Sequence, residues 1–393
     1  MTYRMVEDVP VFGDIDENTV KQALNCRKFA DFMAVSADGH YGYAVPIGGI
    51  MASRELVSPS AVGYDIACGN KAVLTNATAK SVRSKIKWHM DEVWKHISFG
   101  VGRNNNEDVD HELFDDETWK MTPVKTLKDM ARNQLGTVGS GNHYVDIFED
   151  EKERIWIGVH FGSRGLGHKI ATHFLKEGGA KDGMDVDPLM VHERSAIGED
   201  YIQCMNLAGR YAYAGRDWVC ARVAKILGAD IVQEVHNHHN FAWKETHSGE
   251  EFWVCRKGAT PARPGQLGFV GGSMGENSVI LEGVESKESR LTMYSTVHGA
   301  GRIMSRTAAA GKMNRKTGER ITAGAVSQEM MDTWMEKAKV ELRGAGLDES
   351  PHCYKRLDSV LEHQGDTIRI LHTLKPLGVA MAGKDSGYDP YAD

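Results

Sequence analysis

The sequence predicts an α+β fold, built as a single intertwined mixed α/β domain over residues 1–393. Segments typical of strands and of helices follow one another without the regular βαβ alternation of a parallel sheet. No low-complexity segment, Pro- or Ser-rich linker or internal repeat divides the chain. The strand-like segments also end in Gly, Asn or Ser next to His, Asp or Cys, and loops held by a rigid scaffold commonly carry function.

The first half of the chain is predicted to contain three helical regions and two strands. Residues 15–33 are predicted to form a helix that leads into the strand MAVSAD (33–38) and a Gly-rich turn. Residues 79–97 and 105–134 are predicted to be largely helical, with polar interruptions. The segment ERIWIGVHF (153–161) has the apolar, β-branched character of a buried strand, and it runs into a loop, GSRGLG.

The second half is predicted to hold two helices and four strands. Residues 201–227 carry apolar positions at helical spacing, and the strand ADIVQEV (229–235) then ends in a histidine cluster. Residues 326–343 are predicted to form an amphipathic helix. The other strand-like segments are EEFWVC (250–255), NSVILEGV (277–284) and TIRILHTLKPLGVAMAG (367–383).

Composition limits the classes of function. The formal net charge is −7, which disfavours a broad, sequence-blind nucleic-acid binder but leaves room for a local basic pocket. No segment approaches the roughly 20 apolar residues of a membrane span, and the N-terminus lacks the apolar run of a signal peptide. The six scattered cysteines predict a reducing, cytoplasmic location, and the 17 histidines are a first indication of metal chemistry.

A carboxylate and a thiolate lie three residues apart in GYDIACGN (63–70). Asp65 and Cys68 are flanked by glycines, so a tight turn could direct both side chains at one ion. Their mixture of hard and soft donors suits a borderline divalent ion, and a thiolate can bridge two ions. The alternative is a buried free cysteine beside an aspartate that caps a turn.

Histidines in Gly- or Asn-rich turns add to this pair. His143 lies in GSGNHYVD, His160 in GVHFGSRGLGH, and His236, His238 and His239 in VHNHHNF. A lone histidine is more often a core or surface residue than a ligand. No pair has the spacing of a zinc finger or of a helical HExxH site, so spacing alone predicts a metal site and no particular metal.

A Gly-rich turn, GGSMGENS (271–278), could hold a phosphate or the edge of a base through its backbone N–H groups. It carries Ser273 and Ser278. It lacks the lysine of a Walker loop and does not match GxGxxG, so a standard P-loop is excluded. A plain hairpin turn is the alternative.

The segment STVHGAGRIMSR (295–306) points to phosphoryl chemistry. His298 precedes three small residues that leave its imidazole uncrowded, and Arg302 and Arg306 follow at helical i, i+4 spacing. A neutral imidazole can attack phosphorus, and guanidiniums stabilise the charge that builds up. Arg164 and the Arg256–Lys257 pair are further candidates for phosphate binding. The alternative for two arginines four residues apart is a solvated helix face.

Taken together, eight segments resemble the RtcB family of RNA ligases and occur in that family's order. They are ADGHYGYAVPIGG, SPSAVGYDIACGN, GSGNHYVD, HFGSRGLGH, HHNF, RKGATPA, GGSMG and HGAGR, with weaker likeness in SPHCYK and KPLGV. The resemblance implies a catalytic domain with a fold peculiar to the family, two Mn²⁺ ions, GTP as cosubstrate and a covalent histidine–GMP intermediate. It also implies joining of RNA 3′-phosphate or 2′,3′-cyclic phosphate ends to 5′-hydroxyl ends, in RNA repair or tRNA splicing, and an archease-like activator.

The family's functional residues carry over position by position. The metal ligands would be Asp65, Cys68, His143, His160 and His239, with Cys68 bridging both ions. His239 is preferred to His236 because the family's ligand is followed by Asn and because the His239–Asn240 pair, followed by Phe, keeps the spacing to RKGA. His298 would be the guanylated histidine. The guanylate pocket would contain Asn142, Asp146, Asn240, Gly271, Gly272, Ser273, Met274, Ser278, Gly299, Ala300, Gly301, Tyr354 and Lys384. RNA or phosphate would be held by Arg164, Lys257, Arg302 and Arg306.

Two departures from the family pattern concern guanine. The family commonly has Glu where Asp146 stands. It often ends at a lysine that contacts guanine, and an ungapped match puts Met381 there, with Lys384 three residues further on. Two other classes of function use much of the same chemistry. A dinuclear-metal phosphoesterase would need the ligands without His298, and a non-ligating RNA-end or nucleotide-binding paralogue would have lost joining.

Overall fold

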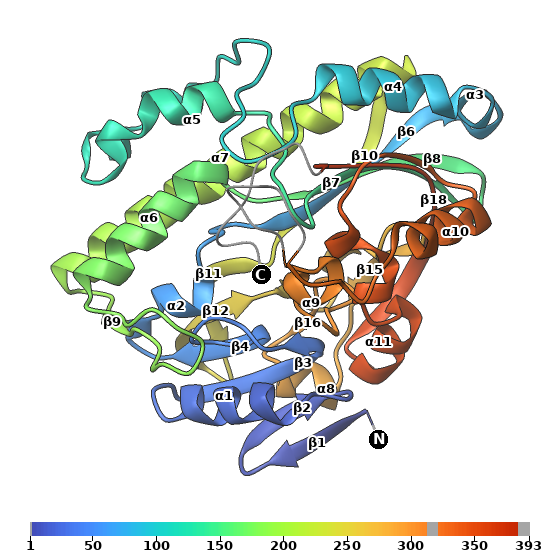
Figure 1. Cartoon of the computed structure of the whole chain (residues 1–393). Helices are drawn as coiled ribbons and strands as arrows, with labels where there is room; N and C mark the ends of the chain where they lie inside the picture. The colour runs from blue at the N-terminus through green and yellow to red at the C-terminus, as the bar shows by residue number, and fades with distance from the viewer. Residues whose placement is uncertain (1, 313–320, 384–393) are drawn as a thin grey trace.

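Two β-sheets with helices packed around them form the protein, which we describe from a computed structural model of residues 2–312 and 321–383 (Figure 1). The six-stranded sheet has the order β1 (Tyr3–Val6), β2 (Val9–Phe12), β3 (Phe32–His40), β4 (Ile47–Ser53), β12 (Glu250–Lys257) and β11 (Asn240–His247). The eight-stranded sheet has the order β10 (Ile231–His238), β6 (Gly69–Thr78), β8 (Arg154–Phe161), β7 (Tyr144–Asp150), β18 (Ile368–Met381), β15 (Ser278–Gly283) and β14 (Leu267–Val270), with β17 (Glu341–Gly344) beside β18.

Strands from distant parts of the chain are neighbours in both sheets. The six-stranded sheet begins with β1–β4 and is completed by β12 and β11, and β18 lies between β7 and β15. Most neighbouring strands are antiparallel, whereas β2–β3 and β17–β18 are parallel. The predicted mixed α/β fold without a βαβ rhythm is therefore confirmed. Two short pairs complete the strands: β13 (Ala259–Pro261) with β16 (Ser295–Val297), and β5 (Leu56–Val57) with β9 (Val191–His192).

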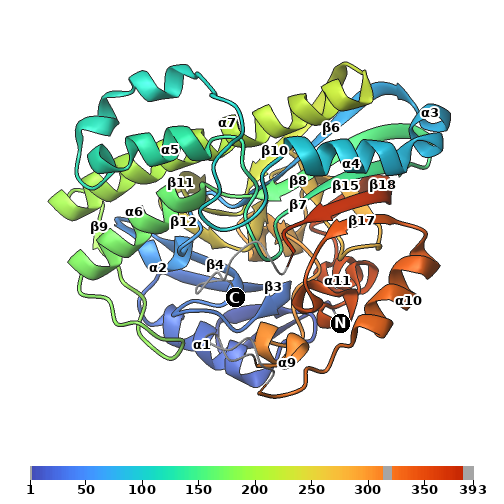
Figure 2. The same cartoon turned by 45° about the horizontal axis from the view of Figure 1, so that its top comes forward.

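Eleven α-helices lie in the described ranges. They are α1 (Glu17–Arg27), α2 (Pro59–Val62), α3 (Ala79–Ser84), α4 (Ile86–His96), α5 (Lys128–Gln134), α6 (Arg164–Glu177), α7 (Ala196–Leu227), α8 (Lys287–Leu291), α9 (Arg306–Ala310), α10 (Gln328–Ala338) and α11 (Leu357–Gln364). In Figures 1 and 2, α2 and α6 lie on one side of the molecule, and β15, α10 and α11 lie on the other. No helix among these is long and apolar enough to cross a membrane.

The longest helix, α7, connects two hydrophobic cores. It begins at Ser195, whose hydroxyl accepts the Gly198 N–H, and ends at Gly228 in the left-handed conformation. Its first half packs in the core that contains α5, α6 and the six-stranded sheet. Its second half packs against β6, β7 and β8 in the core beneath the eight-stranded sheet. Helix α7 thereby fixes the two sheets relative to each other.

Most strand predictions are confirmed, and three helix predictions are wrong in extent. The helix predicted over 15–33 ends at Arg27, because the apolar residues from Phe32 onward pair with β4. In the region predicted as 105–134, only Lys128–Gln134 is α-helical. The side chains of His111 and Asp116 there accept nearby backbone N–H groups and start short 3₁₀ turns in place of a long helix.

The remaining differences concern residues next to the site. The predicted loop GSRGLG begins helix α6 at Arg164, because Leu166, Ile170 and Phe174 bury one face at helical spacing. The helix predicted over 326–343 ends at Ala338, and Glu341–Gly344 instead pairs in parallel with β18. Arg302 and Arg306 do not share a helix, because α9 begins only at Arg306.

Candidate metal and nucleotide site

Segments from both sheets line a cavity of about 510 Å³, which we call the main cavity. The eight-stranded sheet places its contributions by register. Tyr144 at the start of β7 pairs with His160 near the end of β8. Gly69 at the start of β6 pairs with Phe161 on one side and His238 on the other. Antiparallel pairing therefore brings the residues that flank these strand ends to one edge of the sheet.

The five side chains predicted as metal ligands lie together at this edge. Cys68 Sγ lies 3.6 Å from Nε2 of His143 and 3.6 Å from Nε2 of His160. Asp65 Oδ2 lies 3.1 Å from His143 Nε2. The His239 ring stacks on the His160 ring with centroids 5.0 Å apart. A carboxylate, a thiol and three imidazoles can therefore converge on borderline divalent ions.

The hydrogen bonds around these histidines fit a metal centre. His160 Nδ1 lies 2.6 Å from Asn70 Oδ1, which orients Nε2 toward Cys68. Within the residues described, Nδ1 of His143 and Nδ1 of His239 are buried and have no hydrogen-bond partner. Buried polar atoms are usually satisfied, so these nitrogens are available to a ligand. His236 is excluded from this group, because its Nε2 accepts a hydrogen bond from Arg216.

Electrostatics favours the forms that bind metals. Burial lowers the pKa of His160 and of His239 well below the ordinary value, so both imidazoles are neutral. Burial and the Asp65 carboxylate raise the pKa of the Cys68 thiol well above its ordinary value. Burial also acts to raise the pKa of Asp65, but contacts with His143 outweigh it and leave that pKa lowered. A divalent cation that binds here would displace the thiol proton.

A buried carboxylate holds His298 at the wall of the main cavity. His298 Nδ1 lies 2.6 Å from Asp38 Oδ2, and Asp38 is completely buried. The same oxygen accepts the backbone N–H groups of His298 and Gly299. Burial acts to raise the pKa of Asp38, but its contacts with His298 and Ser36 outweigh burial and keep the carboxyl ionised. This geometry places the imidazole proton on Nδ1 and leaves the Nε2 lone pair available.

Close backbone packing also constrains the turn after His298. Gly301 has φ +75°, and a Cβ there would collide with the Asp38 carbonyl oxygen. The His298 ring lies 4.8 Å from the His239 ring, centroid to centroid. His298 is therefore held between Asp38 and the candidate metal ligands.

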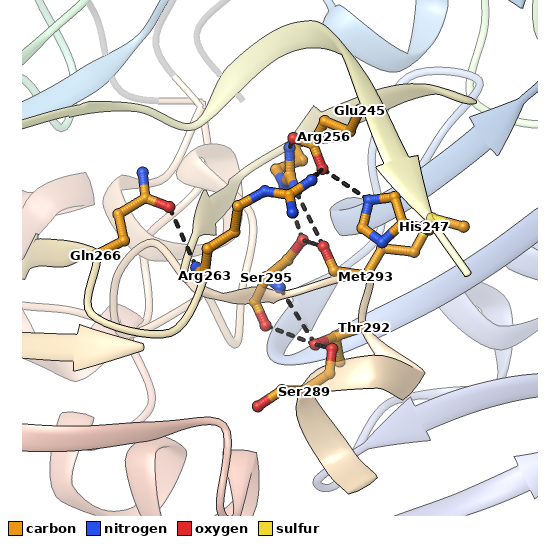
Figure 3. A network of polar contacts seen from close by, with 9 residues as sticks. All are labelled: Glu245, His247, Arg256, Arg263, Gln266, Ser289, Thr292, Met293 and Ser295. Atoms are coloured by element: carbon orange, nitrogen blue, oxygen red, sulfur yellow. Dashed lines mark hydrogen bonds and ion pairs between the residues drawn. The ribbon is translucent and has the colours of Figure 1, made fainter. Parts of the chain in front are cut away.

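A buried polar network lies behind the strand that leads to His298 (Figure 3). Arg256 is completely buried and ion-pairs with Glu245 at 2.6 Å. It also donates to Ser295 Oγ at 2.7 Å and to the Met293 carbonyl at 3.0 Å. Met293 and Tyr294 are non-glycine residues with positive φ, which costs backbone energy. The Glu245–Arg256 pair therefore stabilises the strained turn from which β16 and His298 follow.

Most of the predicted guanylate-pocket residues line the main cavity. They are Asn142, Asp146, Asn240, Gly271, Gly272, Ser273, Met274, Gly299, Ala300, Gly301 and Tyr354. Asn240 also joins two loops, since its side chain donates to the Asp65 carbonyl and accepts the Gly258 N–H. Ser278 is not among the lining residues. Its hydroxyl accepts the Gly272 N–H and shapes the turn from behind.

Asp146 and Met381 lie close together in the wall of the cavity. Met381 pairs with Tyr144 on β7, and Asp146 lies two residues further along that strand. Burial raises the pKa of Asp146 well above its ordinary value and thus favours the neutral form of this carboxyl. Among the described residues its Oδ1 has no hydrogen-bond partner. Lys384, predicted as a substitute for the family's lysine, lies outside the described residues.

The arginines near the cavity have acidic partners that the sequence analysis missed. Arg302 donates to Tyr354 Oη and ion-pairs with Glu349 at 3.5 Å. Arg306 ion-pairs with Glu349 and, at 2.9 Å, with Asp348. Arg164 lines the cavity and donates to the Gly100 carbonyl. A phosphate group that binds here would compete with Glu349 for Arg302 and Arg306.

Two of the predicted phosphate-binding residues lie elsewhere. Lys257 does not line the main cavity, and its amine donates to the carbonyl oxygens of Tyr43 and Val45. Arg256 belongs to the Glu245 network. The two residues are neighbours on β12 and point to opposite faces of its sheet, Arg256 into the Glu245 network and Lys257 toward the carbonyl oxygens of Tyr43 and Val45.

Three functional candidates were missed in the sequence: Asp38, Asn70 and Glu349. Asp38 and Asn70 lie inside the motifs ADGHYGYAVPIGG and GYDIACGN, but nothing local pairs Asp38 with a histidine 260 residues away. Asn70 donates to the His298 carbonyl as well as contacting His160. No sequence signal distinguishes Glu349 from a surface carboxylate.

The fold and the site define a mixed α/β protein with a buried Asp/Cys/His centre beside a carboxylate-held histidine. Comparison with known proteins gives the family. Residues 19–124 and 118–382 match the family model described as tRNA-splicing ligase RtcB. The chain is 30% identical to the RNA-splicing ligase RtcB of Escherichia coli K12, over 93% of this chain and 94% of that protein. It is 31% identical to the tRNA-splicing ligase RtcB of Archaeoglobus fulgidus, over 93% and 91%. The chain belongs to the RtcB family.

Proposed function

We propose that the protein is an RNA ligase that joins 3′-phosphate or 2′,3′-cyclic phosphate ends to 5′-hydroxyl ends, with GTP and Mn²⁺. The observation that carries this proposal is the arrangement of His298. Its Nδ1 lies 2.6 Å from the buried Asp38 carboxylate, and its ring lies beside the candidate ligand His239 in a chain of the RtcB family. The names of the relatives support ligation of RNA as the reaction.

Asp65, Cys68, His143, His160 and His239 would hold two Mn²⁺ ions, with the Cys68 thiolate bridging them. When bound, the ions neutralise negative charge on phosphate oxygens. The mixed donor set and the unpartnered buried nitrogens of His143 and His239 support this assignment. Asn70 would keep His160 in the tautomer that can coordinate a metal ion through Nε2.

His298 would be the nucleophile toward GTP. Its Nε2 lone pair attacks the α-phosphorus, a P–N bond forms, and the bond to the pyrophosphate oxygen breaks. Asp38 stabilises the positive charge of the resulting imidazole, because its carboxylate lies 2.6 Å from Nδ1. An oxygen of the RNA 3′-phosphate then displaces His298 and takes the guanylyl group. The 5′-hydroxyl oxygen finally attacks the RNA phosphorus, GMP leaves, and the hydroxyl proton passes to solvent. A 2′,3′-cyclic phosphate is first opened by water.

The guanylate would lie against the turns around Gly272 and Gly299, with Asp146 and Met381 at the base. The lining residues support a pocket of nucleotide size. Arg164, Arg302 and Arg306 would bind phosphate groups of the RNA ends. Their location around the main cavity supports this role, and Glu349 would lower the positive charge until the substrate binds.

All six cysteines are free and buried, which supports a reducing cytoplasm as the protein's location. An archease-like activator is proposed on the family's pattern.

Intact-mass measurement after incubation with GTP and Mn²⁺ tests the proposal. We expect a GMP adduct that is acid-labile and base-stable, absent in His298→Ala, and dependent on Mn²⁺. His298→Ala should keep its metal content, whereas Cys68→Ser should lose Mn²⁺. Ligation of 3′-phosphate to 5′-hydroxyl RNA should vanish in His298→Ala, while ends that already carry a guanylyl group should still be joined in part. A dinuclear phosphoesterase would give no adduct and would release phosphate regardless of His298. Absence of both adduct and joining in the wild-type protein would exclude the ligase.

A further inference from the structure

A second hollow opens beside the main cavity, between α6, the end of α2 and residues 180–183. Its volume is about 270 Å³, and we call it the side pocket. The lining residues that could contact a ligand include Tyr43, Tyr64, Thr172, Lys176, Lys181 and Lys257. Tyr64 lines both hollows, so they lie next to each other on either side of this residue. Helices α2 and α6 lie side by side in both Figure 1 and Figure 2.

One row of side chains on α6 leads from the main cavity to the side pocket. Arg164, His168, Thr172 and Lys176 follow at intervals of four residues, which puts them in a row that winds slowly along the helix. The first two line the main cavity, and the last two line the side pocket. Twelve residues of helix span about 18 Å at 1.5 Å per residue, room for several nucleotides of an extended strand.

Aromatic rings lie at the junction of the two hollows. Tyr64 stacks on His168 with ring centroids 5.4 Å apart, and Tyr43 meets Tyr64 edge-on at 6.3 Å. Tyr43 and Tyr64 are only half-buried. Aromatic side chains of this kind accept unpaired bases by stacking, whatever the base.

Positive charge surrounds the side pocket in a chain with a net charge of −7. Lys176 and Lys181 are exposed at the rim, and the only acidic residue among the lining residues is Asp182. Lys257 is 5% exposed and lies at the base, where the carbonyl oxygens of Tyr43 and Val45 accept from its amine at 2.7 and 3.1 Å. The Lys257 ammonium therefore adds a positive charge beneath the lysines at the rim.

We propose that the side pocket binds a nucleotide of an RNA strand whose reactive end lies in the main cavity. Its backbone phosphate meets the lysines, and its base stacks on Tyr43 and Tyr64. The inference rests on the proposed ligase function and extends it. The enzyme recognises several nucleotides of single-stranded RNA before the end that it joins. Lys257, which does not reach the main cavity, thereby acquires a role in binding RNA phosphate.

Fluorescence anisotropy with labelled single-stranded RNA decamers tests this subsite. One decamer carries a 3′-phosphate and the other a 5′-hydroxyl, and both are measured with Mn²⁺ and without GTP. Lys176→Ala/Lys181→Ala should weaken binding of at least one strand by roughly fivefold or more, and should reduce the salt slope by about 1.4 for two lost phosphate contacts. The matched control is Lys80→Ala/Lys225→Ala, which removes two exposed lysines that line neither hollow and should leave both quantities unchanged.

Stacking is tested separately at Tyr43. Tyr43→Ala should weaken binding of the same strand, whereas Tyr43→Phe should keep most of the affinity because the ring remains. Comparison of the two decamers shows which RNA strand passes through the side pocket, since only the binding of that strand should weaken in the variants. Unchanged affinity and salt slope for both strands in the lysine variant would overturn the inference.

Formation of the His298–GMP adduct needs no RNA, so it separates the two proposals. The lysine variants should form the adduct at the wild-type rate. If the wild-type protein forms no adduct and joins no ends, the ligase proposal fails, and the binding measurements still decide whether the side pocket holds RNA. If the adduct forms normally and RNA affinity is indifferent to the lysines, only the side-pocket inference fails.

Discussion

At the scale of single residues, the properties of His298 depend on one buried carboxylate. Asp38 contacts the ring through Oδ2 and is itself oriented by Ser36, which donates to Oδ1 at 2.6 Å. The carboxylate supplies both a hydrogen-bond acceptor and a negative charge. An asparagine at this position can keep the acceptor but not the charge, which allows the two contributions to be separated.

Asp38→Asn should slow formation of the GMP adduct by roughly 10- to 100-fold, as loss of a supporting partner commonly does. Asp38→Ala should slow it further, because it also removes the acceptor that orients Nδ1. Rapid-quench measurement of adduct formation gives the rate, and metal analysis should find unchanged Mn²⁺. The control Asp8→Asn removes an exposed aspartate that pairs with Arg27 outside the cavity. Wild-type rates in Asp38→Asn would mean that the charge is not used.

Asp146 and Met381 line the main cavity, and under the proposed function they would lie next to the base. The Met381 side chain cannot donate a hydrogen bond to a guanine carbonyl, so GTP and ATP should be discriminated weakly. Met381→Lys should raise the ratio of adduct formation with GTP over ATP by at least about tenfold, because a base without the matching group leaves buried donors unpaired. Strict GTP use by the wild-type protein, unaltered in Met381→Lys and in Lys384→Ala, would disprove this explanation.

At the scale of elements, the Glu245–Arg256 pair links β11 and β12 to the turn before β16 (Figure 3). Burial acts to raise the pKa of Glu245, but the charge of Arg256 and hydrogen bonds from His247 and Arg256 outweigh it, so the pKa is lowered. A carboxyl with a lowered pKa in the folded state contributes stability above its unfolded pKa, near 4.5, and loses that contribution as the pH falls below it.

Glu245→Gln should lower the free energy of unfolding by about 3 kcal/mol at pH 7, because it leaves a buried arginine without its counter-charge. The difference from wild type should shrink as the pH is lowered below about 4.5, where the unfolded wild-type carboxyl takes up a proton. Urea unfolding at several pH values measures both effects. Glu250→Gln is a matched control, since its pair with Arg54 is half-exposed and should contribute under about 1 kcal/mol. A pH-independent difference would contradict the assignment.

The strands could be predicted from the sequence better than the helices. The segment 153–161 is short, apolar and rich in β-branched residues, which favours a buried strand over a helix. The helix prediction for residues 105–134 was largely wrong, because polar side chains there cap short 3₁₀ turns, which composition does not reveal. The start of α6 was not predicted, because glycines in GSRGLG are typical of a loop. The sequence nevertheless shows Leu166 and Ile170 at helical spacing, and the structure buries both.

The site was predictable where a motif carried it and not where a tertiary contact did. His160 lies near the end of β8 and the other four candidate ligands lie just outside strand ends, and strand register brings these ends together. Asp38 and Glu349 act through partners far away in the chain, so no local pattern marks them. The location of Lys257 outside the main cavity could not be predicted, because the direction of its side chain depends on the pairing of β12 with β4.

At the scale of the whole molecule, α7 joins the two main cores, and each sheet combines strands that are far apart in the chain. We therefore propose that residues 1–393 fold as one unit, as the sequence predicted. Calorimetry should show a single transition. Leu207→Ala in the first core and Val223→Ala in the second should both move that same transition to lower temperature, with the leucine variant costing roughly 2–5 kcal/mol. Two transitions, each sensitive to only one variant, would show two separate units.

The candidate ligands gather at one end of strands β7 and β8, and the opposite ends of these strands lie on the other side of the eight-stranded sheet. The turn between β7 and β8, at residues 151–153, is exposed and lies at the far ends of these strands. The register that pairs Tyr144 with His160 does not depend on this turn alone, because β7 is also held by β18 and β8 by β6. This turn is consequently the place where a reporter domain or an affinity tag can be inserted without altering the geometry of the cavity.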